Sequence, residues 1–268
     1  MQLYFEYRMK KLLTLLLFIQ GFYISVQGQY TTLNAHSHND YAQETPFTLA
    51  YNAHFGSIEA DIWAVNGILY VAHDSSAITP SRTLESLYLQ PIAELYQKAG
   101  GKAWIDSPST FQLLIDLKTA TEPTLSLLVE LLKKYPGIFD SDRNKNAIQV
   151  VITGNRPMPS EFSKYPNNIS FDANITLHYD QAQLMRVALF SGNLADYVHW
   201  KGKEALSNDE QLKLSHVIDS VHGLQKKIRF WNAPDTRFAW GQLMKLRVDY
   251  VNTDHIHELA TYLETHKN

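Results

Sequence analysis

The chain of 268 residues carries 45% apolar and 19% charged residues, with a formal net charge of −3. This composition is typical of a globular protein with a sizeable core and excludes a disordered chain. The acidic balance disfavours nucleic acid as a partner, because binding to a phosphate backbone needs a basic surface. The chain has no cysteine, which excludes disulfides, thiolate nucleophiles and zinc–sulfur sites.

The first 28 residues have the pattern of a secretory signal peptide. Three basic residues between positions 8 and 11 precede an apolar run over 12–26, and Ser25-Val-Gln-Gly28 follows. The run is shorter than the ~20 residues of a membrane span, which is the alternative interpretation. We expect cleavage after Gly28 and a secreted or periplasmic protein. Cleavage would remove three basic residues and one acidic residue, leaving 21 Lys and Arg against 26 Asp and Glu, a net charge of −5.

Strand-like and helix-like segments alternate beyond residue 28, with no linker or low-complexity stretch between them. The expected strands cover 32–36, 57–64, 112–118, 148–153, 169–173, 196–200, 227–232 and 249–253. The expected helices cover 48–54, 84–99, 123–135, 181–190, 209–224, 236–246 and 257–265. Eight such strands predict an α/β protein, a single (β/α)8 TIM barrel over 29–268. An open doubly wound sheet is the alternative, but no glycine-rich loop follows the first strand.

Two local signals refine this barrel. Val65-Asn-Gly67-Ile predicts a hairpin turn, so a hairpin is inserted after the second strand and its returning arm carries His73. Ser207-Asn-Asp-Glu210 predicts an N-terminal capping box, and Gly223 marks the end of that helix.

Three acidic residues lie inside apolar strand-like segments. Glu59 and Asp61 are two residues apart and therefore point to the same face of their strand, and Asp116 lies in Leu-Leu-Ile-Asp-Leu-Lys. Such charges are unfavourable unless they bind a metal, pair or react. An exposed strand face and an internal Asp116–Lys118 ion pair are the alternatives. Carboxylates without sulfur ligands favour Mg2+ or Ca2+, so we predict that these three residues bind a divalent cation.

Two histidines flank the predicted metal site: His36 at the end of the first strand, and His73 on the hairpin arm. A metal that holds a phosphoryl oxygen, one histidine that attacks or deprotonates a nucleophile and one that protonates the leaving oxygen constitute a phosphodiesterase. We expect Lys118 to stabilise the negative charge of the transition state. We also expect Asn39 to hydrogen-bond a phosphate oxygen and Asp74 to orient His73.

Four segments resemble the phospholipase C-like phosphodiesterase superfamily, which includes glycerophosphodiester phosphodiesterases and spider-venom-type phospholipases D. These segments, which lie between residues 35 and 118, are Ala-His36-Ser-His-Asn39-Asp, Gly-Ser-Ile-Glu59-Ala-Asp61, Val-Ala-His73-Asp and Leu-Ile-Asp116-Leu-Lys118-Thr. The fungal altered-inheritance-of-mitochondria group and its bacterial relatives are the closest resemblance.

This resemblance implies a distorted TIM barrel that uses Mg2+ or Ca2+. It places His36 and His73 on the two catalytic histidines, and Glu59, Asp61 and Asp116 on the metal ligands. Lys118 matches the site lysine of the superfamily, and Trp231 matches an aromatic residue that lines the pocket. The His-Arg-Gly and Pro-Glu-Asn-Thr signatures of ordinary glycerophosphodiesterases are absent. The substrate therefore stays open between a glycerophosphodiester, a phospholipid and a related phosphodiester.

Two other functions compete with this prediction. His36-Ser-His38 and His255-Ile-His257 are H-x-H pairs, which multi-metal phosphomonoesterases and amidohydrolases use, although this leaves Glu59 and Asp116 unexplained. The other alternative is an exported barrel that binds without catalysis. The main hypothesis is a monomer that binds a phosphodiester small molecule or a lipid headgroup. We expect it to contact membranes peripherally and not to bind nucleic acid.

Overall fold

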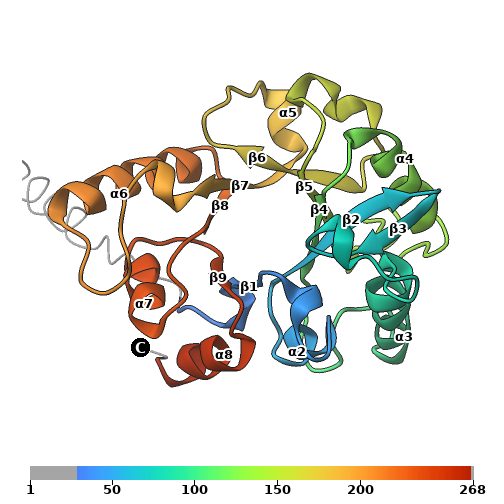
Figure 1. Cartoon of the computed structure of the whole chain (residues 1–268), viewed down its shortest axis with the longest axis horizontal. Coiled ribbons are helices and arrows are strands. Elements are labelled where there is room, and N and C mark those ends of the chain that lie inside the picture. Colours follow the sequence, from blue (N-terminus) through green and yellow to red (C-terminus); the bar gives the residue numbers. More distant parts are fainter. Residues whose placement is uncertain (1–28, 267–268) are drawn as a thin grey trace, which may run out of the picture. The chain divides into compact units, whose positions relative to one another are not determined.

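Eight parallel strands form a nearly closed barrel in the computed structural model, which describes residues 29–266 (Figure 1). The strands are β1 (Ala35–Ser37), β2 (Ser57–Val65), β4 (Gln112–Leu117), β5 (Gln149–Gly154), β6 (Ile169–Asn174), β7 (Val187–Asn193), β8 (Lys227–Trp231) and β9 (Val251–Thr253). They follow the order β8-β7-β6-β5-β4-β2-β1-β9, and a parallel bridge between Arg229 and Tyr250 links β8 to the start of β9. The predicted TIM barrel is confirmed.

Helices lie outside this ring of strands (Figure 1). They are α2 (Thr48–Asn52), α3 (Gln90–Lys98), α4 (Thr121–Leu132), α5 (Gln181–Met185), α6 (Asn208–Gly223), α7 (Arg237–Lys245) and α8 (Ile256–Thr265). Ser207 caps α6 in a reciprocal capping box with Glu210, as predicted. None of the helices in this described part of the chain is long and apolar enough to span a membrane. The predicted signal peptide, residues 1–28, lies outside the described residues.

The period-2 alternation of the strands separates two cores. Ile58, Ala60 and Ile62 of β2 are fully buried in the larger core, which the strands share with the helices. The opposite face of the sheet holds a small apolar cluster inside the barrel: Leu114, Val151, Leu189 and Tyr250. Polar side chains occupy the rest of that inner face, so the barrel interior is where charged chemistry is concentrated.

The predicted hairpin is also confirmed. β3 (Ile68–Val71) pairs antiparallel with β2, from Val65 opposite Ile68 to Ile62 opposite Val71. Asn66 and Gly67 both have positive φ, 50° and 79°, as a tight two-residue hairpin turn requires. The hairpin extends β2 past the barrel wall and brings the chain back toward the barrel mouth at residue 72.

The predicted strand at 196–200 and the predicted end of the helix at 181–190 are wrong. α5 ends at Met185, Val187–Asn193 forms β7, and a 3₁₀ turn follows at Leu194–Asp196. A short apolar run such as Val-Ala-Leu-Phe fits a helix or a strand equally well, so periodicity could not separate them. The helix ends where Arg186 turns its guanidinium to the carbonyl oxygens of Phe162, Pro166 and Ile169.

Candidate active site

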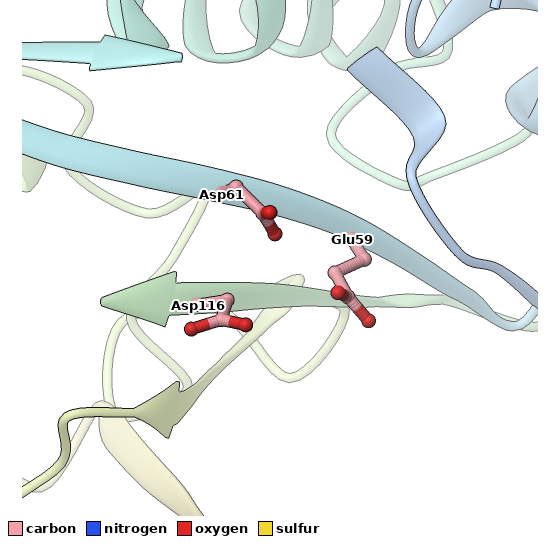
Figure 2. Close-up of side chains that lie close together, drawn as sticks. All are labelled: Glu59, Asp61 and Asp116. Carbon is pink, nitrogen blue, oxygen red and sulfur yellow. The ribbon is translucent and has the colours of Figure 1, made fainter. Parts of the chain in front are cut away.

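Three carboxylates meet at the carboxyl ends of β2 and β4. Glu59 and Asp61 project from one strand and Asp116 from its neighbour, into the same space (Figure 2). The parallel register sets Asp61 opposite Asp116, and one oxygen of each carboxylate lies within 4.8 Å of the others. Glu59 and Asp61 are 4% and 1% exposed. Within residues 29–266, this is the one cluster of three or more acidic or histidine side chains with such spacing.

Asp61 shows that this cluster fits a cation. Burial raises the pKa of Asp61 to about 6, and the Glu59 charge acts in the same direction. Its Oδ2 accepts from Lys118 Nζ at 2.9 Å and lies 2.8 Å from the Tyr41 hydroxyl. Its Oδ1 is buried and has no hydrogen-bond partner among the described residues. An oxygen-ligated divalent cation would satisfy that orphaned oxygen, so the donor set fits Mg2+ or Ca2+.

Lys118 and Gly154 fix the third carboxylate. Lys118 Nζ lies 2.8 Å from Asp116 Oδ2, so the ion pair considered as an alternative does form, while the same amine also contacts Asp61. Burial by itself would lower the pKa of Lys118, but the hydrogen bond to Asp116 and the Asp61 charge raise it. The amine is therefore cationic. A Cβ on Gly154 would come within 1.9 Å of Asp116 Oδ1, so glycine leaves the space that this carboxylate occupies.

His36 is fully buried at the base of the site. Its Nδ1 lies 2.7 Å from Ser57 Oγ, and its Nε2 lies 2.8 Å from Glu59 Oε2 and 2.6 Å from Arg229 Nη1. Burial, together with the Arg229 charge, lowers the pKa of His36 to about 4, so the ring is neutral at neutral pH. A neutral nitrogen either donates or accepts, so Nε2 serves Glu59 or Arg229 and not both.

Glu59 is more firmly ionised than Asp61. Burial by itself would raise its pKa, but the hydrogen bond to His36 and the Arg229 charge hold the pKa below its usual range. Arg229 Nη1 donates to Glu59 Oε2 at 2.9 Å. The carboxylate is thus a fixed anion beneath the cation site.

His73 lies at the mouth of the barrel, just after β3, with 63% of its side chain exposed. Its Nδ1 is 3.0 Å from the Tyr41 hydroxyl and 3.3 Å from Asp61 Oδ2. Asp61 and Tyr41, rather than the neighbouring Asp74, orient this ring within the described residues, so the role expected for Asp74 is wrong. The contacts of the ring with other described residues are made by Nδ1, not by Nε2.

His38 and Asn39 face a different carboxylate. His38 Nδ1 lies 2.9 Å from Asp254 Oδ1, and Asn39 Nδ2 donates to the same oxygen at 3.3 Å. The Tyr41 hydroxyl donates to Asn39 Oδ1 at 2.6 Å. Because His36 and His38 turn to separate partners, the structure does not assemble the H-x-H metal site of the alternative hypothesis. Asn39 lies beside the site with both ends of its amide engaged by the protein.

Trp231 ends β8 and is 43% exposed. It lines a pocket at the same end of the barrel whose described walls include none of the three carboxylates. Sequence reasoning missed Arg229 and Asp172, which alternate with apolar neighbours inside strands just as Glu59 does, so the same rule would have found them. It also missed Tyr41, which no periodic pattern marks.

A barrel whose strand ends carry a carboxylate cluster, histidines and a lysine fits the class of phosphodiesterase barrels. The sequence matches the AIM6-like phosphodiesterase domain over residues 25–171, and residues 227–256 match the glycerophosphoryl diester phosphodiesterase family. The chain belongs to the AIM6-like phosphodiesterase family, which confirms the resemblance seen in the sequence.

Named relatives agree with this membership. Altered inheritance of mitochondria protein 6 from Kluyveromyces lactis is 27% identical over 300 residues, covering 85% of this chain and 72% of the relative. A homolog of that protein from Arthroderma benhamiae is 25% identical, covering 85% of this chain and 82% of the relative. A glycerophosphodiester phosphodiesterase from Parabacteroides distasonis shares the fold, with a TM-score of 0.51, 13% identity, and coverage of 87% of this chain and 97% of that chain.

Proposed function

We propose that this protein is a metal-dependent phosphoric diester hydrolase that acts on a glycerophosphodiester, a phospholipid or a related phosphodiester. The observation that carries the proposal is the cluster of Glu59, Asp61 and Asp116, with a buried Asp61 oxygen that lacks a partner. These residues would hold Mg2+ or Ca2+, which when bound supplies positive charge to a phosphoryl oxygen. Lys118 adds a fixed cation at the same place.

The two histidines carry the protons in this proposal. A new P–O bond forms to a water or a hydroxyl of the substrate, and the bond from phosphorus to the leaving alcohol breaks. His73, exposed at the mouth, donates a proton to the leaving oxygen through Nε2. His36, neutral because its pKa is lowered to about 4, accepts the proton of the nucleophile. For this step Nδ1 carries the ring proton and donates to Ser57 Oγ, and Arg229 releases the lone pair of Nε2 when the substrate binds.

We also propose that the chain is exported and acts as a monomer. The support for export is the sequence pattern of residues 1–28. Export would bring the enzyme to membrane lipids and their breakdown products. N-terminal sequencing of the protein recovered outside the cytoplasm should begin at Gln29, and recovery only of the uncleaved chain inside cells would overturn this proposal.

Hydrolysis of bis-p-nitrophenyl phosphate with and without EDTA tests the enzymatic proposal. We expect EDTA to abolish activity and Mg2+, Ca2+ or Mn2+ to restore it. We expect kcat/KM for the diester to exceed that for p-nitrophenyl phosphate at least ~10-fold, about 1.4 kcal/mol of transition-state binding. Full activity in metal-free protein, or faster hydrolysis of the monoester, would overturn the proposal. A barrel that only binds would hydrolyse neither.

A further inference from the structure

A second polar pocket opens at the same end of the barrel, over the ends of β5, β6, β7 and β8. Its volume is about 380 Å³. Its walls include Thr153, Arg156, Asp172, Ser191 and Trp231. None of these residues belongs to the carboxylate cluster, and apart from Trp231 none was singled out from the sequence.

Asp172 gives this pocket an unsatisfied acceptor. The residue is 1% exposed, and its Oδ2 accepts from Thr153 Oγ1 at 2.9 Å. Its Oδ1 is buried without a hydrogen-bond partner in residues 29–266. Buried carboxylate oxygens are rarely left without a hydrogen-bond partner, because each one loses its hydration without compensation. A ligand hydroxyl donor in the pocket would satisfy it once the carboxylate turns this oxygen toward the ligand.

The pocket and the proposed catalytic site share one floor. Arg229 donates to Glu59 Oε2 at 2.9 Å on one side, and on the other its Nη2 lies 3.8 Å from Asp172 Oδ2. Its Nε donates to Ser191 Oγ at 3.1 Å. The strand register also sets Thr153 of the pocket directly opposite Asp116. A group bound in the pocket can therefore be joined to a phosphate at the carboxylates.

The pocket carries both signs of charge. Arg156 lies in the wall with Asp172 and Asp196, and Arg229, whose nearer partner is Glu59, lies in the floor. Two arginines so close to Asp172 disfavour an ammonium headgroup, while the hydroxyl and amide side chains of the wall can pair with hydroxyl groups. The half-exposed indole of Trp231 offers a flat apolar face, and the volume admits a six-membered ring.

We infer that this pocket binds a neutral polyhydroxylated ring, a sugar or a cyclitol, as the alcohol portion of the phosphodiester. Asp172 Oδ1 accepts from a ring hydroxyl, and Trp231 packs against the ring face. The inference rests on the proposed phosphodiesterase function and specifies its substrate.

The test compares kcat/KM for glycerophosphoinositol, glycerophosphoglycerol, glycerophosphocholine and glycerophosphoethanolamine. We expect glycerophosphoinositol to be preferred over each of the others at least ~10-fold. Asp172→Asn, which keeps the shape of the side chain, and Trp231→Ala should each reduce that preference to within about 2-fold. Phe238→Ala removes an equally exposed aromatic side chain outside the pocket and should keep the preference. Equal rates on all four diesters, or a preference for choline, would overturn the inference.

A direct binding measurement separates this inference from the proposed function. Saturation-transfer NMR with myo-inositol and with methyl glucoside reports ring binding without turnover and distinguishes the cyclitol from the sugar. If no diester is hydrolysed, the proposed function fails, while transfer that Asp172→Asn or Trp231→Ala abolishes would still support the pocket. No transfer to either ring in the wild-type protein, together with no substrate preference, would overturn the pocket assignment.

Discussion

Asp61 carries an unfavourable negative charge, because it is buried beside Glu59 and Asp116 and its pKa is raised to about 6. We expect Asp61→Asn to lose divalent-cation binding and at least ~100-fold in kcat. The melting temperature should not fall, because the amide keeps the shape and removes like-charge repulsion. Calorimetric titration with Mn2+ measures the cation affinity, and a thermal melt measures the melting temperature. Asp142→Asn, on the exposed surface, is the control, and unchanged cation affinity in Asp61→Asn would contradict the prediction.

His73 is the proposed acid, and the leaving group can test that role. We expect His73→Ala to lose at least ~100-fold in kcat on glycerophosphodiesters, whose alcohols need a proton to leave. The loss on bis-p-nitrophenyl phosphate should be much smaller, because nitrophenolate leaves without one.

His38 supplies the comparison for His73, since it is a partly exposed histidine held by Asp254 instead of Asp61. His38→Ala should be milder than His73→Ala and should not distinguish the two leaving groups. Equal losses in His73→Ala on both substrates would show that His73 is not the acid. Equal losses in the two variants would show that His73 has no role in the reaction that His38 lacks.

Much of the site was predictable residue by residue, wherever a charge interrupts an apolar alternation. Glu59, Asp61 and Asp116 follow from that rule alone, and the structure brings them together. Tyr41 and Asp254 were not predictable, because each lies in a turn where no period constrains the direction of a side chain. Their contacts with His73 and His38 depend on how the turns fold over the barrel mouth.

At the scale of elements, the turn after β1 is held by one buried carboxyl. Asp40 accepts from Ser37 Oγ at 2.8 Å, from Tyr88 OH at 2.9 Å and from the Phe47 amide. These bonds tie the short 3₁₀ turn at Asp40–Ala42 (which carries Tyr41) to the chain entering α2. The turn therefore positions the hydroxyl that contacts His73.

Asp40 makes stability depend on pH. Burial raises its pKa from 3.8 to about 6, against the three hydrogen bonds that lower it. The folded state thus binds the proton more tightly than the unfolded chain. The resulting contribution to the free energy of unfolding is about 3 kcal/mol. It is fully present below about pH 4 and is lost as pH rises through 6. Urea unfolding at pH 4, 5, 6 and 7 should show it as a component that Asp40→Asn removes. An identical pH dependence in the variant would refute the assignment.

Element boundaries were predictable where turn chemistry marks them and not elsewhere. Asn66-Gly67 and Ser207 identify a hairpin and a helix start from the residues alone. β7 had no such marker, because Arg186 ends the preceding helix through contacts with carbonyl groups that are 17 to 24 residues away in the chain. Sequence periodicity is a local signal and does not predict contacts between residues that far apart in the chain.

At the scale of the whole barrel, closure depends on Asp249. Its Oδ2 accepts from the Ile228 amide and lies 2.8 Å from His222 Nε2, and its own amide donates to the Ile228 carbonyl. We expect Asp249→Ala to lower the free energy of unfolding by about 2–3 kcal/mol, measured in urea, because a buried amide loses a charged acceptor. Asp219→Ala removes a surface ion pair with Arg247 and should change the free energy of unfolding by less than about 1 kcal/mol. Equal effects in the two variants would show that Asp249 does not close the barrel.

The barrel class was predictable because eight alternations of strand and helix leave few other topologies. How the ring closes was not, since β1 and β9 are only three residues long and have almost no pattern of their own.

The short strands at the closure also make one side of the site less resistant to heat than the other. His36 and the Asp254 that holds His38 lie on or beside β1 and β9, whereas the three carboxylates lie on β2 and β4, which are paired over six residues. Elements with few backbone pairs open first. On warming, we expect the histidine side to loosen while the carboxylate side is still folded. Thermal inactivation should then precede thermal unfolding, and the upper working temperature of the protein is set by two three-residue strands rather than by its core.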